Sequence, residues 1–234
     1  MSNGRKTLFI ISFLIIDLLL VSGILLIRDM TGKNILNKEM MNLTKLDISK
    51  DSFDTEIKSK GEYAVVEKAI KKYLDDYSTE IQTILNTRYD DKLNNLLDID
   101  NYKDDGPLFE ESIEYVELVR NNFNYNVDIL KERVNDDAIN NHIYNYDVDG
   151  NDVQLYNNLL VSYCILDKIE ESQNSLDSES IKINNYIDSI YNTLCYLRDN
   201  SSSYSIVDDE LVFYDDIVRE NYLDLFNKTK RIFD

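Results

Sequence analysis

The segment with the clearest potential for chemistry is NYDVDGND, residues 145–152. Its oxygen-bearing side chains alternate with other residues as in the first half of a calcium-binding loop, and a glycine stands at the sharp turn. These weak candidate ligands are Asn145, Asp147, Asp149 and Asn151. The second half does not fit, because position 12 is Tyr156 instead of a bidentate Glu. A polar turn that caps the next helix explains the same residues, so we expect no metal and no cofactor.

Catalytic groups do not converge elsewhere in the sequence. His142 is the only histidine, and no cysteine lies near it, so neither a metal site nor a Ser-His-Asp arrangement is indicated. Adjacent carboxylates do occur, but a chain with 44 acidic residues contains such pairs by chance. The pairs are Asp90-Asp91, Asp104-Asp105 and Asp208-Asp209. Glycosidase-type hydrolysis requires two carboxylates across a cleft, which spacing along a chain cannot show. The prediction is a protein without enzymatic activity and without catalytic residues.

Cys164 and Cys195 are too few for a disulfide scaffold and lack metal-ligand spacing. If the stretches that hold them form a hairpin turning near Ser175, Cys164 lies opposite about residue 186. The mismatch is about 13 Å along a helix, whereas a disulfide tolerates about 7 Å between Cα atoms. We therefore expect buried, unpaired thiols.

The N-terminal part contains an apolar run, Thr7–Ile27, bounded by Arg5-Lys6 and Arg28. Its 21 residues match the roughly 20 that cross the hydrocarbon core of a membrane. A cleaved signal peptide is the alternative, but its apolar region is usually shorter, and Val21-Ser22-Gly23 is a poor cleavage site. The sequence therefore predicts an uncleaved transmembrane anchor over residues 7–27.

Asp17 lies in the middle of this apolar run. A carboxylate at the bilayer centre costs about 2.5–3.5 kcal/mol on insertion scales, and such residues usually face a partner or a wet cavity. Our hypothesis is that Asp17 bonds to a polar or basic residue of another membrane helix, from a second copy or a different subunit. The alternative is a neutral, protonated carboxyl group that is merely tolerated.

The distribution of charge bears on topology and on partners. Residues 1–33 hold four basic and two acidic residues, a net charge of +2. Since the whole chain carries −19, the remaining residues carry −21. That surface repels nucleic acids, so the expected partners are the lipid bilayer and possibly another membrane protein or a second copy. Basic residues flank both ends of the anchor, but long domains translocate largely regardless of charge. We expect a single-pass protein of the cell membrane with its C-terminal domain outside, and a cytoplasmic domain is the alternative.

The domain prediction that follows has four parts. Residues 1–6 form a cytoplasmic tail, residues 7–27 the anchor, residues 28–60 a juxtamembrane stalk and residues 61–234 an acidic helical exterior domain.

Apolar residues at three- and four-residue steps predict four long helices in this exterior domain. The first runs from about Gly61 to Asp98, and the second begins at Gly106-Pro107 with proline at its first position. The third begins near Asp152, capped by Asn151 or Asp152, and a break at Ser172–Ser180 separates it from the fourth.

Two β-prone runs flank Asp208-Asp209 and predict a small hairpin over residues 204–214, followed by a last helix from about Asp216 to Phe233. The predicted fold is mainly α: an N-terminal transmembrane helix and an antiparallel helical bundle with a small β-hairpin near the C-terminus.

Several short motifs carry a resemblance. They are Leu93-Asn-Asn-Leu-Leu97, Asn101-Tyr102, Asp105-Gly106-Pro107-Leu-Phe109 and Leu211-Val-Phe-Tyr214 with the helix that follows. In these motifs the chain resembles uncharacterised single-pass, membrane-anchored helical proteins of Gram-positive bacteria. The resemblance implies a place in the cell envelope and no particular activity.

These observations favour a membrane-tethered, extracytoplasmic binding or scaffolding module. An envelope hydrolase with carboxylates that converge only in the fold, and a sensory subunit that acts through a membrane partner, are the alternatives.

Overall fold

The computed structural model describes residue 22 and residues 29–233. The predicted anchor, apart from residue 22, and its Asp17 lie outside the described residues. Within the described part of the chain, no helix is long and apolar enough to span a membrane. This part is mainly helical with one antiparallel two-stranded sheet, which confirms the predicted helical class and the hairpin.

Residues 29–43 are helical, and an irregular segment follows up to residue 60. The remaining elements, in chain order, are α2 (Glu62–Leu85), η1 (Asn86–Tyr89), α3 (Asp91–Asn95), α4 (Ile99–Asp104), α5 (Glu110–Arg133), α6 (Asp136–Asn141), η2 (His142–Asn145), α7 (Gly150–Ser162), α8 (Ile165–Asp199), η3 (Ser201–Ser203), β1 (Tyr204–Val207), β2 (Glu210–Phe213) and α9 (Asp216–Lys230).

The chain divides into two compact units. Unit 1 comprises the residues up to 47, residues 51–75 and residues 140–168, and unit 2 comprises residues 48–50, 76–139 and 169–234. These units do not coincide with the predicted stalk and exterior domain, because part of the predicted stalk supplies core side chains to unit 1. Those side chains, each at most 7% exposed, are Leu36, Met40, Leu43 and Phe53.

Unit 1 also holds a group of charged side chains, Glu39, Lys58, Glu67 and Lys71, which we call the ionic cluster. Glu39, Glu67 and Lys71 are buried, and Lys58 is exposed. The Lys71 ammonium lies 2.8 Å from carboxylate oxygens of both Glu39 and Glu67 and donates to the Glu56 carbonyl at 2.6 Å. Glu67 in turn accepts the backbone N–H of Lys58 at 3.1 Å. The cluster therefore fastens the irregular segment and the helix over residues 29–43 to α2.

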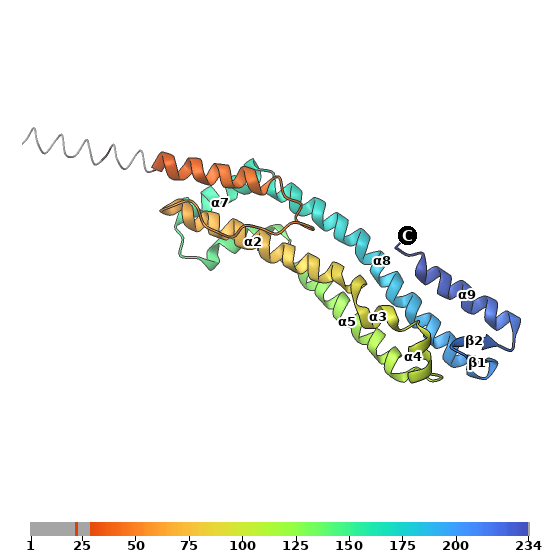
Figure 1. Ribbon diagram of the computed structural model, residues 1–234. Coiled ribbons are helices and arrows are strands. Elements are labelled where there is room, and N and C mark those ends of the chain that lie inside the picture. The colour runs from red at the N-terminus through yellow and green to blue at the C-terminus, as the bar shows by residue number, and fades with distance from the viewer. Residues whose placement is uncertain (1–21, 23–28, 234) are drawn as a thin grey trace, which may run out of the picture. The chain divides into compact units, whose positions relative to one another are not determined.

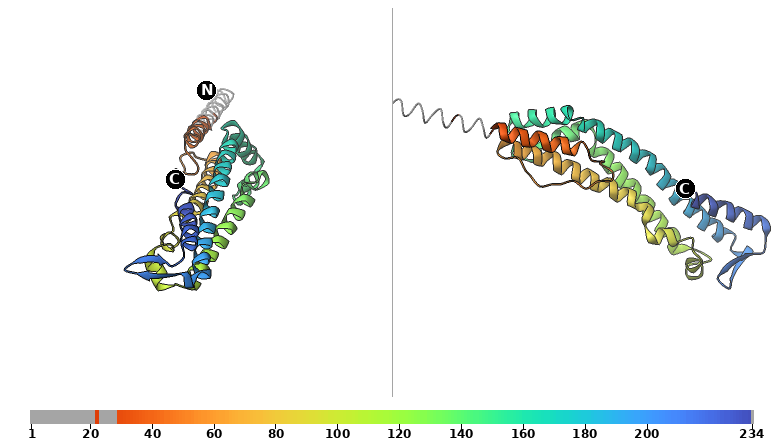
Figure 2. Two further views of the ribbon diagram at one scale, coloured as in Figure 1. Left: turned by 90° about the vertical axis from the view of Figure 1, so that its right-hand side faces the viewer. Right: turned by 45° about the horizontal axis from the view of Figure 1, so that its top comes forward.

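Ion pairs and hydrogen bonds show the relative directions of the helices in unit 2. On α5 and α8, Arg120 pairs with Asp188 and Lys131 pairs with Asp177, so the residue numbers run in opposite directions and the helices are antiparallel. α9 is antiparallel to α8 as well, because Tyr196 bonds to the Val218 carbonyl and Ser189 bonds to Thr229. Figures 1 and 2 show α9 lying back along α8 after the hairpin.

The predicted break at Ser172–Ser180 is wrong, because α8 continues without interruption from Ile165 to Asp199. Apolar residues recur every seven positions on its buried face, and the intervening serines Ser172 and Ser180 are themselves buried. Small hydroxyl side chains there allow close helix packing and were misread as turn signals. The positions of the heptad are Ile169, Leu176, Ile183, Ile190 and Leu197, each at most 3% exposed.

Two further expectations need correction. α5 begins at Glu110 and not at Gly106-Pro107, which lies upstream in a turn with a cis peptide bond. Both cysteines are free, as predicted, but Cys164 is exposed and Cys195 only half-buried, because the expected hairpin between them does not form.

Candidate functional site

The predicted calcium segment forms a helix cap. Asp149 is the N-cap of α7, where its Oδ1 accepts the N–H groups of Asn151 at 2.7 Å and Asp152 at 3.1 Å. The Asp152 carboxylate completes a capping box by accepting the N–H of Asp149 at 3.0 Å. The cap is therefore Asp149 and not Asn151 or Asp152. Because the Asp149 side chain is already engaged, millimolar calcium is expected to leave the melting temperature unchanged.

The described residues contain no group of three or more His, Cys, Asp or Glu side chains that could hold a metal ion. His142 is half-buried, with its ring 5.3 Å from that of Tyr73 and 5.8 Å from that of Tyr146. Two of the carboxylate pairs supply structural bonds: Asp90 caps α3 by accepting the N–H of Leu93, and Asp105 accepts the N–H of Ser112 in the first turn of α5.

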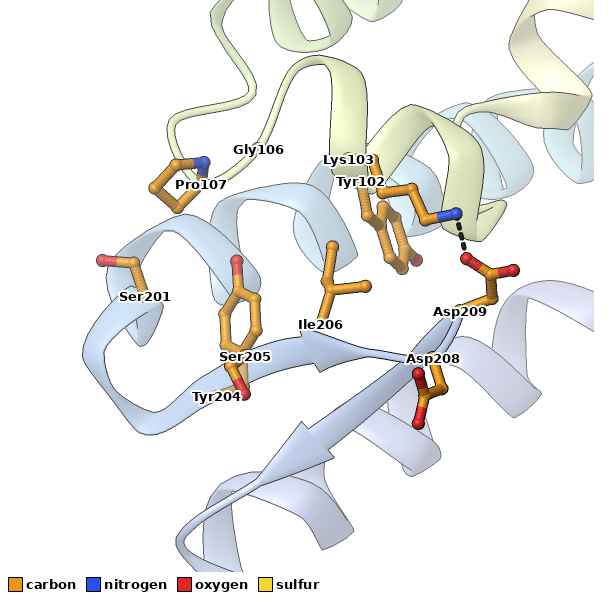
Figure 3. A pocket seen from close by; sticks show the side chains of 10 residues that line it. All are labelled: Tyr102, Lys103, Gly106, Pro107, Ser201, Tyr204, Ser205, Ile206, Asp208 and Asp209. Atoms are coloured by element: carbon orange, nitrogen blue, oxygen red, sulfur yellow. Dashed lines mark hydrogen bonds and ion pairs between the residues drawn. The ribbon is translucent and has the colours of Figure 1, made fainter.

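The third pair, Asp208-Asp209, borders a pocket of about 550 Å³ in unit 2, which we call the hairpin pocket (Figure 3). One wall is α4 with the loop that follows it, and the other is the short η3 segment with β1 and the hairpin turn. The residues that line it are Tyr102, Lys103, Gly106, Pro107, Ser201, Tyr204, Ser205, Ile206, Asp208 and Asp209. Its volume lies in the range of ordinary small-molecule sites.

The first wall depends on tight packing after α4. A Cβ at Gly106 would overlap the carbonyl oxygen of Tyr102, so a glycine is required at this approach. Phe109 has φ of 54°, which is unusual for an aromatic residue, and its ring is fully buried 5.7 Å from that of Tyr102. Burial of the Phe109 ring thus holds the loop in a conformation that its backbone alone would not favour.

The second wall is the hairpin, whose turn fits its sequence. Asp208 and Asp209 both have positive φ, 48° and 66°, as a two-residue turn of type I′ requires, and aspartate tolerates this conformation better than most residues. In the resulting register Tyr204 pairs with Phe213, and both side chains lie on the face that turns toward the protein.

Aromatic rings form a continuous cluster behind the pocket. The Tyr102 and Tyr222 hydroxyls are hydrogen-bonded at 3.2 Å, and both are buried. The Phe213 ring lies 5.2 Å from that of Tyr222 and 5.8 Å from that of Tyr204. Burial raises the pKa of Tyr102 and Tyr222, so both phenols are neutral at physiological pH.

Tyr204 differs from these neighbours. Its side chain is only 8% exposed, and its buried hydroxyl has no hydrogen-bond partner in the described part of the chain. Burial, with a smaller contribution from Tyr222, raises the pKa of Tyr204 to about 12, so the group is an intact O–H. Figure 3 shows this hydroxyl directed across the pocket toward the loop of Gly106 and Pro107. A hydroxyl in this position can both donate and accept a hydrogen bond.

Charges lie at the other end of the pocket. Lys103 forms an ion pair with Asp209 and lies 3.6 Å from a carboxylate oxygen of Asp100. The hydrogen bond with Asp209 raises the pKa of Lys103, which is therefore fully charged at neutral pH. In Figure 3 the Asp208 carboxylate points to the opposite side of the turn from that of Asp209.

The sequence predicts the hairpin and a helix start at Gly106-Pro107, but it does not bring the two together. Lys103 and Asp209 are 106 positions apart, and no local pattern links them. One sequence signal indicates that Tyr204 is buried: it stands two positions before Ile206 in a β-prone run, so the two side chains share one face of a strand.

Comparison with protein-family models, with curated proteins and with solved structures gives no match to this chain.

Proposed function

We propose that the protein is a membrane-tethered binding module that faces the cell exterior and holds a small ligand in the hairpin pocket. The observation that carries the proposal is the Tyr204 hydroxyl, which is buried in a pocket wall and has no hydrogen-bond partner among the residues that the structure describes. An unsatisfied buried hydroxyl costs about 1–3 kcal/mol, and a ligand that bonds to it would recover that free energy. The tether rests on the apolar run of residues 7–27, and envelope placement is also what the resemblance implies.

Binding can be measured on the full-length chain purified in detergent. A panel of fragment-sized probes of positive, neutral and negative charge is titrated and followed by saturation-transfer NMR. We expect at least one class to bind, and the variant Tyr204→Phe to weaken that binding. Tyr214→Phe is the matched control, because Tyr214 is 68% exposed and does not line the pocket. Binding that is equal in the wild type and Tyr204→Phe would reject the hairpin pocket as the site.

An envelope hydrolase is the second candidate. The two carboxylates at the pocket come from consecutive positions, Asp208 and Asp209, on one turn, and the second is paired with Lys103. Hydrolysis of a glycosidic bond needs carboxylates on both sides of the substrate. The pocket therefore supports binding better than it supports this chemistry.

The topology has its own test. Protease treatment of intact cells or protoplasts should remove the helical part, and N-terminal sequencing should find residues upstream of Gly23. Protection from the protease would reverse the orientation, and a start at Ile24 would indicate a cleaved signal.

A sensory role would need a membrane partner, for which Asp17 is the candidate contact. We expect Asp17→Leu to retain membrane insertion and to reduce the yield of a crosslinked complex, because the substitution removes the carboxyl that another helix would bond. A crosslinking pattern that matches the wild type would leave Asp17 as a tolerated carboxyl group.

A further inference from the structure

The charges at the rim of the hairpin pocket favour one class of ligand. Lys103 contributes one positive charge and lies next to the carboxylates of Asp100 and Asp209, and Asp208 adds a third negative charge on the other side of the turn. Beyond residue 33 the chain carries a net charge of −21. An anionic ligand would be repelled by this field, whereas a cation would be attracted and concentrated near the rim.

The Lys103 ammonium shows that the rim accommodates an alkylammonium group. It lies near the carboxylates of Asp100 and Asp209 at the edge of the pocket, and the Lys103 side chain is 37% exposed. A ligand ammonium would meet the same acceptors and could share or exchange the position that the lysine occupies.

Apolar side chains line part of the pocket as well. Pro107 contributes from the loop, Ile206 from β1 and Tyr102 from α4. A bare inorganic cation would leave these side chains uncovered, whereas the carbon skeleton of an organic ligand would contact them and be removed from water. At the far end, the Tyr204 hydroxyl is available to bond a hydroxyl or carbonyl group (Figure 3).

We propose that the hairpin pocket binds an organic ammonium compound, with the ammonium at the acidic rim, the carbon body against Ile206 and Pro107, and a hydroxyl or carbonyl at the Tyr204 end. This inference rests on the binding function proposed above for the same pocket.

Three probes share a 4-hydroxyphenyl group and differ in the charge of the side chain: tyramine is positive, tyrosol neutral and 4-hydroxyphenylacetate negative at pH 7. Each is titrated into the full-length chain in detergent and followed by saturation-transfer NMR. At low salt we expect tyramine to bind about two- to fivefold more tightly than tyrosol, since the ion pair forms at a partly exposed rim. We expect 4-hydroxyphenylacetate to bind most weakly, and the differences to shrink at high salt.

Two substitutions address the two ends of the pocket. Tyr204→Phe should weaken tyramine and tyrosol alike, by about two- to tenfold, because each loses one hydrogen bond. Asp209→Asn keeps a residue that tolerates positive φ and frees Lys103, so it should favour 4-hydroxyphenylacetate over tyramine. Asp147→Asn, which makes the same change of net charge on an exposed residue of unit 1, should leave the order unchanged.

The outcomes separate the inference from the function that it rests on. If tyrosol or 4-hydroxyphenylacetate bound as tightly as tyramine and Tyr204→Phe weakened that binding, the ammonium preference would be wrong and the binding pocket would stand. If Tyr204→Phe changed the binding of none of the three probes, both proposals would fail.

Discussion

Lys71 in unit 1 and Tyr204 in unit 2 are both withdrawn from water, with exposed fractions of 1% and 8%, but their surroundings differ. The Lys71 ammonium has three acceptors, the carboxylates of Glu39 and Glu67 and the carbonyl of Glu56, which match its three hydrogens. The Tyr204 hydroxyl has no acceptor and no donor in the described part of the chain.

The difference separates two uses of a buried polar group. A buried charge whose hydrogen bonds are all made by the protein fixes a particular arrangement of segments. Its removal leaves the partner charges buried without a counter-ion. A hydroxyl that the fold leaves unsatisfied lowers stability, and its retention makes sense where a ligand completes the bond. Unit 1 illustrates the first case and the hairpin pocket the second.

The largest expected effect on stability comes from removing the Lys71 ammonium from the ionic cluster. Lys71→Met keeps the approximate length of the side chain but removes the cation of buried Glu67 and one of the two cations of buried Glu39. We expect the free energy of unfolding to fall by about 3–5 kcal/mol in urea titrations. Lys72→Met is the control. The Lys72 side chain is next in sequence and 51% exposed, so this substitution should change the free energy of unfolding by less than about 0.5 kcal/mol. Equal effects of the two substitutions would show that the ionic cluster contributes no specific stability.

Acid should weaken the same cluster. Burial alone would raise the pKa of Glu67, but its hydrogen bonds to Lys71 and Ser59 outweigh burial, so the pKa lies below its ordinary value of 4.5. The pKa of Glu39 is likewise lowered, with hydrogen bonds from Lys71 and Lys58 outweighing burial. A lowered folded-state pKa gives stability that is present above pH 4.5 and is lost as the pH falls through the folded-state pKa.

We therefore expect the urea midpoint to fall steeply below about pH 4.5 in the wild type. The fall should be shallower when Glu39 and Glu67 are both replaced by Gln, because fewer protons are then taken up on unfolding. A matched variant with Gln at the exposed positions Glu132 and Glu220 should retain the wild-type slope. If the urea midpoint of the Glu39 and Glu67 double variant fell with pH as steeply as that of the wild type, groups outside the ionic cluster would cause the acid sensitivity.

Local chemistry explains which parts of the fold could be predicted from the sequence. The turn at Asp208-Asp209 follows from two residues that tolerate positive φ between β-prone runs, and the start of α9 at Asp216 follows from a capping aspartate. Ser172–Ser180 was misread because serine favours caps and turns by itself, while here buried apolar neighbours on α8 override that preference.

The candidate site could not be predicted in the same way. It depends on the meeting of α4 and the hairpin, which are far apart in the sequence, and on which hydroxyl finds a partner there. Tyr102, Tyr204 and Tyr222 are the same residue type on amphipathic elements, yet two of them bond to each other and the third bonds to neither. Only the three-dimensional packing of their rings decides this.

A smaller effect than that of Lys71→Met is expected from the satisfied tyrosine pair. Tyr222→Phe leaves the Tyr102 hydroxyl buried without its partner, which should lower the free energy of unfolding by about 1–3 kcal/mol. Tyr214→Phe removes a hydroxyl from a side chain that is 68% exposed and should change stability by less than about 0.5 kcal/mol. Thermal unfolding of the two variants side by side measures the difference.

The smallest expected change in stability comes from Tyr204→Phe, and it is the one that tests the comparison most directly. The hydroxyl has no hydrogen bond to lose within residues 29–233, and its removal relieves the cost of burying it. Stability should therefore stay constant or rise by up to about 1 kcal/mol. The same substitution should weaken the binding of tyramine, so stability and binding would move in opposite directions, as is common at sites shaped for a ligand. A purely structural role for Tyr204 predicts instead that both would be unaffected or that both would fall. Should Tyr204→Phe destabilise the protein as much as Tyr222→Phe does, the hydroxyl must have a partner within the protein, and the contrast with Lys71 would no longer hold.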